Sequence, residues 1–179
     1  MTRLDSAIRR LTAQRSILDW AARHVTGRPG LILELGLGNG RTFDHLRDRL
    51  PGRDIYVFER APAAHPESMP VEDYLIIGDM FETLPAFHRR FGSRCAVLIH
   101  ADIGTGDEAE NGRVAARLGP VLQPLMREGG LVVGDRPFLL EGCVDISNQT
   151  GVETGRYYVY RRAGPSSHPA REAQSRSES

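Results

Sequence analysis

The chain has no lysine, few cysteines and no long apolar run. All 23 of its basic residues are arginine, which excludes Schiff-base chemistry and a lysine acting as phosphate ligand or general base. Cys95 and Cys143 lack CxxC spacing and a neighbouring histidine cluster, so neither a zinc site nor a disulfide framework is indicated. No run has membrane length, and no apolar segment follows Met1. These absences predict a cytoplasmic protein with no membrane partner.

The chain also has no net charge, because 23 acidic residues balance the 23 arginines. This balance gives no indication of a nucleic-acid backbone as partner, and a small-molecule ligand fits it better. With 179 residues the chain is long enough for one catalytic domain and too short for two typical ones. Any ligand pocket is therefore expected to be built by one sheet and its loops.

Composition divides the chain into three parts. Residues 1–28 form an N-terminal amphipathic helical segment of one or two helices, because apolar residues recur at intervals of three and four from Leu4 to Val25. Residues 29–162 form the main domain. Residues 163–179 are rich in Ser, Pro, Arg and Glu with little to bury, which predicts a disordered tail.

Within the main domain, five apolar runs each end on or beside an acidic residue. The runs are 31–34, 55–59, 74–79, 96–102 and 131–135, and helical patterns at 41–50, 83–91 and 114–126 lie between them. Such alternation predicts an α/β fold with a mainly parallel sheet whose carboxyl rim carries the acids. Two further strands are predicted at 143–146 and 156–161, and the helix expected between residue 135 and the first of them must be very short or absent. Gly119-Pro120 and Pro124 predict an interruption in the third helix.

The first apolar run leads into a glycine turn, Gly36-x-Gly38-x-Gly40, with Glu34 two residues before it. Dinucleotide-binding folds expect GxGxxG, and a pyrophosphate is disfavoured beside a carboxylate. A cofactor that carries a sulfonium and an ammonium group instead suits an acidic rim. The acids at the ends of the first four runs therefore favour S-adenosylmethionine over NAD; they are Glu34, Glu59, Asp79 and Asp102.

At these residues the chain resembles the class I S-adenosylmethionine-dependent methyltransferases, over roughly residues 29–162. The segments 35–42, 56–60 and 100–102 look more narrowly like a small bacterial family of single-domain methyltransferases. The resemblance implies a Rossmann-like three-layer α/β/α sandwich. Its seven-stranded, mostly parallel sheet would have the order 3-2-1-4-5-7-6, with the last strand antiparallel.

The resemblance also implies roles at the cofactor site. The glycines would make room for the methionine part of the cofactor, with Glu34 near its ammonium group. Glu59 would accept hydrogen bonds from the ribose hydroxyls, and Asp79 with Met80 would face the adenine. The predicted cofactor-binding set is Glu34, Gly36, Gly38, Asn39, Gly40, Glu59, Arg60, Asp79, Met80 and Asp102.

Methyl transfer is an in-line displacement on an activated carbon, so alignment and exclusion of water supply most of the acceleration. The predicted catalytic residues are Asp102, beside the cofactor, and His100, as a base for an acceptor that carries a proton. A histidine satisfied within the core is an equal alternative for His100.

Several alternatives stay open at this stage. Asp102 and Asp135 could hold a divalent metal, but Arg136 stands where an amide ligand is expected, so we predict no metal. The loop 104–107 is either a polar turn or a substrate loop. The sequence predicts a methyltransferase that acts on a small-molecule acceptor. A non-catalytic cofactor-binding module or partner subunit is the first alternative and an NAD-dependent oxidoreductase the second. The oligomeric state is not predicted.

Overall fold

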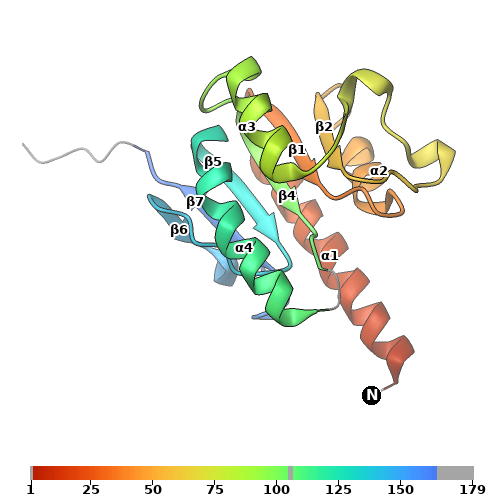
Figure 1. Cartoon of the computed structure of the whole chain (residues 1–179). Helices are drawn as coiled ribbons and strands as arrows, with labels where there is room; N and C mark the ends of the chain where they lie inside the picture. Colours follow the sequence, from red (N-terminus) through yellow and green to blue (C-terminus); the bar gives the residue numbers. More distant parts are fainter. Residues whose placement is uncertain (1, 105–106, 165–179) are drawn as a thin grey trace, which may run out of the picture.

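The computed structural model describes residues 2–104 and 107–164, which form one seven-stranded sheet flanked by helices (Figure 1). The strand order is β3-β2-β1-β4-β5-β7-β6, and β7 is antiparallel to both of its neighbours. Both features confirm the predicted fold. The strands are β1 (Leu31–Leu35), β2 (Ile55–Glu59), β3 (Leu75–Ile77), β4 (Ala96–Ala101), β5 (Met126–Gly134), β6 (Cys143–Asp145) and β7 (Tyr158–Arg162).

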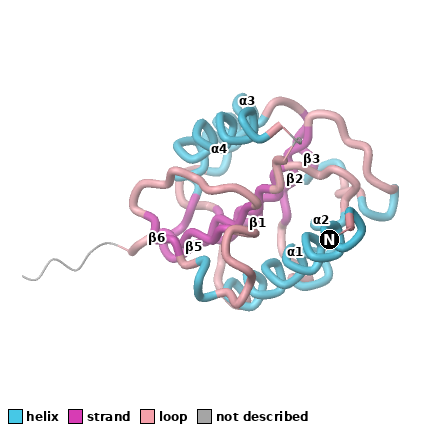
Figure 2. The backbone as a smooth tube through the Cα atoms, turned by 90° about the horizontal axis from the view of Figure 1, so that it is seen from below, coloured by secondary structure: helices cyan, strands magenta, loops and turns pink. Residues whose placement is uncertain are grey.

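The α-helices of the described residues cover both faces of the sheet. They are α1 (Arg3–Val25), α2 (Arg41–Arg49), α3 (Met80–Phe91) and α4 (Glu108–Leu122). Figure 2 shows α1 and α2 on one face and α3 and α4 on the other, which is the predicted three-layer sandwich. Most of the expected tail, from residue 165 onward, and the centre of the 104–107 loop lie outside the described residues.

Alternate residues along each central strand pack against opposite helix layers. In β1, Ile32 packs with α1 and α2, whereas Leu33 packs with α3 and α4. In β5, Leu131 belongs to the first cluster and Val132 to the second. A strand buried on both faces needs apolar residues at every position, which explains the unbroken apolar runs in the sequence.

The N-terminal segment is one helix, α1, and only part of it joins the core. A capping box between Thr2 and Asp5 begins the helix. Ile17 and Val25 in its second half are fully buried, whereas Leu4 and Ile8 are 68% and 55% exposed. The first half of α1 therefore extends past the core, as Figure 1 shows.

Three element boundaries differ from those predicted. Helix α3 begins at Met80 because the Asp79 side chain accepts a hydrogen bond from the Phe81 N–H and caps it. Helix α4 runs from Glu108 through Pro120, and the expected interruption lies only at Pro124, within a short 3₁₀ turn. Strand β5 begins at Met126, because that residue already pairs with β4.

Two expected absences concern the part of the chain that the structure describes. Between β5 and β6, residues 135–142 form no helix, as the short spacing predicts. Among the described helices, none combines the length and the apolar character that crossing a membrane requires.

Candidate active site

A cavity of about 580 Å³ lies at the carboxyl ends of β1, β4 and β5. Helix α1 forms one of its walls, because the first half of this helix extends past the sheet. Of the predicted site residues, Gly36, Gly38, Asn39 and Asp102 line the cavity. The other lining residues are Arg10, Leu11, Gln14, Leu37, Arg41, Thr42, Gly104, Asp135 and Arg136.

The three glycines of the turn all have positive φ, but they serve different needs. A Cβ on Gly36 would lie 3.0 Å from the carbonyl oxygen of Asp102, and one on Gly40 would lie 2.6 Å from the Cβ of Ser68. A Cβ on Gly38 would meet no protein atom within 4 Å. Only Gly38 thus leaves open space for a ligand, whereas the other two allow the backbone to pack closely.

Glu59 fastens this turn to the end of β2. One carboxylate oxygen accepts hydrogen bonds from the N–H groups of Leu37, at 2.8 Å, and Gly38, at 3.2 Å. The other oxygen accepts from the N–H groups of Arg60, at 2.7 Å, and Ala61, at 3.0 Å. Partial burial opposes ionisation, but these four donors outweigh it and lower the pKa of Glu59. The carboxylate is therefore ionised at neutral pH.

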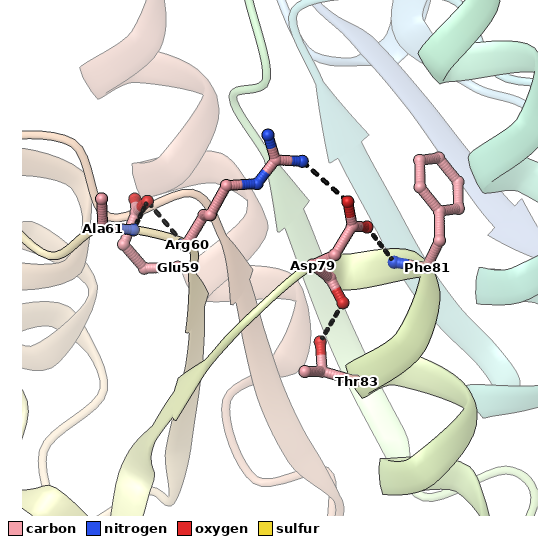
Figure 3. Close-up of polar contacts among 6 residues, drawn as sticks. All are labelled: Glu59, Arg60, Ala61, Asp79, Phe81 and Thr83. Carbon is pink, nitrogen blue, oxygen red and sulfur yellow. Dashed lines mark hydrogen bonds and ion pairs between the residues drawn. The ribbon is translucent and has the colours of Figure 1, made fainter.

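Arg60 and Asp79 form an ion pair at the ends of β2 and β3, with 2.7 Å between Nη2 and Oδ2 (Figure 3). The second carboxylate oxygen of Asp79 caps α3, whose first residue is Met80. The structure thus brings Glu59, Arg60 and Asp79 together on one edge of the sheet. They stand on the β2 and β3 side of the glycine turn and do not line the cavity.

Glu34 and His100 lie beneath the cavity floor. Both side chains are fully buried, and His100 Nδ1 lies 2.8 Å from Oε2 of Glu34. The Thr42 hydroxyl donates to the other carboxylate oxygen, which ties β1 to α2 as well as to β4. The predicted contact of Glu34 with the cofactor's ammonium group and the predicted role of His100 as a base stay predictions; neither residue is among those that line the cavity.

Burial disfavours the charged form of His100, but the adjacent Glu34 carboxylate outweighs this effect and raises the pKa of His100. Its Nε2 atom is buried and has no hydrogen-bond partner among residues 2–104 and 107–164. The attraction between His100 and Glu34 thus holds β4 and β1 together beneath the cavity.

Asp102 is the predicted catalytic residue that does face the cavity. Gln14 of α1, which is 6% exposed, donates a hydrogen bond of 2.5 Å from Nε2 to Oδ2 of Asp102. Tyr157 is also buried nearby, and its burial together with the charges of Asp102 and Asp135 raises its pKa. The N-terminal helix is therefore joined to the strand ends through a polar network.

Burial and the charge of Asp102 raise the pKa of Asp135, whose carboxylate lies 3.4 Å from Arg136 Nε. Within the described parts of the chain, no three His, Cys, Asp or Glu side chains lie close enough together to hold a metal ion. The site offers an acidic pair for a cationic group.

Sequence reasoning missed the residues that α1 contributes. Arg10 is one of many exposed polar residues of this helix, so periodicity alone does not distinguish it, whereas Gln14 is a buried polar residue on the apolar face of α1. Tyr157, just before β7, is a further residue that lies near Asp102 and Asp135. The short connection after β5 does indicate that another element must cover the pocket beside the end of that strand, because no helix follows β5 there.

This combination of sheet, turn and acids defines a class of protein. A Rossmann-like sheet with an antiparallel β7, a glycine turn after β1 and a carboxylate at the end of β2 is the arrangement of the class I S-adenosylmethionine-dependent methyltransferases. The open Cβ position at Gly38 and the carboxylates of Asp102 and Asp135 fit a cofactor with a sulfonium and an ammonium group.

Comparisons with known proteins agree with this class. The family model described as S-adenosyl-L-methionine methyltransferase matches residues 1–162. An S-adenosyl-L-methionine methyl transferase from Silicibacter pomeroyi DSS-3 is 44% identical, with a TM-score of 0.86 over 91% of this chain and 99% of that chain. The chain therefore belongs to the S-adenosyl-L-methionine methyltransferase family, and it is an enzyme that uses S-adenosylmethionine.

More distant structures share the fold. One is the 1,6-didemethyltoxoflavin-N1-methyltransferase of Burkholderia thailandensis, with 15% identity and a TM-score of 0.51 over 85% of this chain and 79% of that chain. Another is an O-methyltransferase family protein of the same species, with 12% identity and a TM-score of 0.51 over 91% of this chain and 59% of that chain. Among curated proteins, none matches this chain.

Proposed function

We propose that the enzyme methylates a small-molecule acceptor bound in the cavity between the glycine turn, the ends of β4 and β5, and helix α1. The observation that carries this proposal is the size of the cavity. Its volume of about 580 Å³ lies within the range typical of small-molecule sites. A macromolecular acceptor would have to reach the strand ends past Arg10, Leu11 and Gln14.

Within this proposal the cofactor lies along the rim from β2 to β4. Gly38 and Asn39 border its methionine part, and Asp102 faces the positively charged end. Glu59 is placed to bind the ribose, and Arg60, Asp79 and Met80 border the base. Because four N–H groups already occupy the Glu59 carboxylate, ribose binding requires some of these donors to be exchanged.

The bound cofactor supplies a methyl group that is already activated by its sulfonium. The protein's contribution is then to orient the acceptor and to exclude water. Gln14 holds Asp102 in place, and α1 covers the reacting side. Cys95 and Cys143 are free thiols, which supports a location in the reducing cytoplasm.

The proposal is tested by separating candidate acceptors according to size. A bacterial extract is divided by ultrafiltration into small-molecule and macromolecular fractions, and each is incubated with the enzyme and methyl-labelled S-adenosylmethionine. We expect label to be transferred into the small-molecule fraction, and transfer to fall at least tenfold with Asp102→Ala. Label incorporated only into the macromolecular fraction would contradict a small-molecule acceptor.

A further inference from the structure

The cavity carries more positive than negative side chains. Arg10 of α1, Arg41 at the first position of α2 and Arg136 after β5 line it, against the carboxylates of Asp102 and Asp135. The whole chain is electrically neutral, so this excess is local.

Two of these arginines, Arg10 and Arg41, differ from nearby arginines in their interactions. In the described parts of the chain, Arg10 and Arg41 have no hydrogen bond or ion pair, whereas the adjacent Arg9 binds Glu153 at 2.8 Å. The cavity carboxylates are already engaged. Arg136 lies 3.4 Å from Asp135, and Gln14, a neutral donor, binds Asp102. Among the described residues, neither cavity carboxylate forms an ion pair with Arg10 or Arg41.

The beginning of α2 adds to this positive potential. Gly40 caps the helix and offers no side chain to its first N–H groups. The hydroxyl of Thr42, in the first turn, is directed to Glu34 beneath the cavity. An uncapped helix N-terminus beside an unpaired guanidinium favours an anion.

The cofactor does not remove this excess. S-adenosylmethionine has one carboxylate but also an ammonium and a sulfonium group, so it adds a net positive charge to the site. Its single carboxylate can neutralise one guanidinium group. With the cofactor bound, positive groups still outnumber carboxylates in the cavity, so an anion between Arg10 and Arg41 remains favourable.

We infer that the methyl acceptor carries an anionic group, a carboxylate or a phosphate, which Arg10 and Arg41 bind. This inference rests on the proposed function and names the acceptor's chemical class. A planar guanidinium presents donors that match either oxyanion in a two-pronged contact. Arg10 and Arg41 come from different helices, α1 and α2, and both line the same cavity.

The test uses three probes of similar shape on the full chain: benzoate, benzamide and phenyl phosphate. Their dissociation constants are measured by ligand-observed saturation-transfer NMR, with and without saturating S-adenosylhomocysteine. We expect at least one anion to bind at least fivefold more tightly than benzamide in the presence of S-adenosylhomocysteine. The tighter of benzoate and phenyl phosphate identifies the anion.

Variants assign the preference to the two arginines. Arg10→Gln and Arg41→Gln are each expected to reduce the preference for the anion at least threefold. The matched control is Arg15→Gln, on an exposed part of α1 outside the cavity, which keeps the wild-type preference. Both test positions are exposed, and circular dichroism checks that the variants fold.

Two results would overturn the inference. One is equal affinity for the three probes in the wild-type protein. The other is an anion that binds only without S-adenosylhomocysteine and is displaced by it, because the arginines would then hold the cofactor's own carboxylate. Failure of S-adenosylhomocysteine to bind would contradict the proposed function instead. In that case the titration without it still decides whether Arg10 and Arg41 form an anion site.

Discussion

His100 and Glu34 form a fully buried pair beneath the glycine turn, with 2.8 Å between Nδ1 and Oε2. The carboxylate also accepts a hydrogen bond from Thr42, so one side chain joins β1, β4 and the first turn of α2. These are the elements that carry Gly38 and Asp102 into the cavity. We therefore propose that Glu34 positions the elements that carry the cofactor site.

Removal of the Glu34 charge is expected to change how stability depends on pH. The pKa of His100 is higher in the folded protein than in the unfolded chain, where it is near 6.5. The protonated His100 therefore stabilises the folded state at pH values below 6.5, and this stabilisation is lost as the pH rises through the pKa of the folded protein. Urea unfolding of the wild type between pH 6 and pH 9 should show this loss. Glu34→Gln should be less stable by about 3 kcal/mol at pH 6 and show a smaller loss.

The same pair predicts the outcome for His100. His100→Gln should lower the melting temperature, since it leaves a buried carboxylate without its cation. If this variant kept the wild-type melting temperature and lost turnover, His100 would be a catalytic base after all. The account would also be contradicted if the free energy of unfolding depended on pH in the same way in Glu34→Gln and in the wild type.

Loss of the Glu59 carboxylate is expected to affect both stability and cofactor binding. Glu59→Ala removes the acceptor of four N–H groups, and because these groups lie near solvent we expect a cost of only about 1–2 kcal/mol. The affinity for S-adenosylhomocysteine, measured by calorimetry, should fall at least tenfold. Unchanged affinity would show that the ribose is bound elsewhere.

The glycine turn offers a pair of matched substitutions. Gly38→Ala places its Cβ in open space and should cost about 1 kcal/mol for the left-handed backbone, while S-adenosylhomocysteine binding weakens. Gly40→Ala drives its Cβ to 2.7 Å from the Ser68 carbonyl oxygen, and it should cost more than 2 kcal/mol. Equal destabilisation by the two variants in thermal unfolding would contradict their different roles.

Gln14 provides a test of the contact between α1 and the site. Gln14→Glu places a second carboxylate against Asp102, where the wild type has a 2.5 Å hydrogen bond. Like charges repel, so the variant should lose about 1–2 kcal/mol more stability than the wild type between pH 5 and pH 8. Thr12→Glu, on an exposed turn of the same helix, is the control. Equal losses in the two variants would argue against the contact.

Much of the fold follows from local sequence patterns. Buried parallel strands need unbroken apolar runs, and Gly36 and Gly38 need positive φ, so both features are visible without a structure. The strand order and the antiparallel β7 came from the resemblance to known methyltransferases. The start of α3 was missed because Asp79 is a helix cap as well as a strand-end acid.

The site was harder to predict, because the direction in which a side chain points matters there as much as its position in the sequence. Glu34 stands two residues before Gly36, but its side chain lies within the core and binds His100. Sequence shows that both residues end strands and does not show to which side they point. Arg10 and Gln14 reach the cavity only because α1 extends past the sheet, a tertiary arrangement that periodicity does not encode.

Calorimetric titration with S-adenosylmethionine, S-adenosylhomocysteine and NADH, on the wild type and on Asp102→Ala, tests the central claim most directly. We expect micromolar binding of both adenosyl compounds, no binding of NADH, and at least tenfold weaker binding by Asp102→Ala. Binding of the adenosyl compounds that Asp102→Ala leaves unchanged would contradict the assigned site, and no adenosyl binding at all would contradict the account.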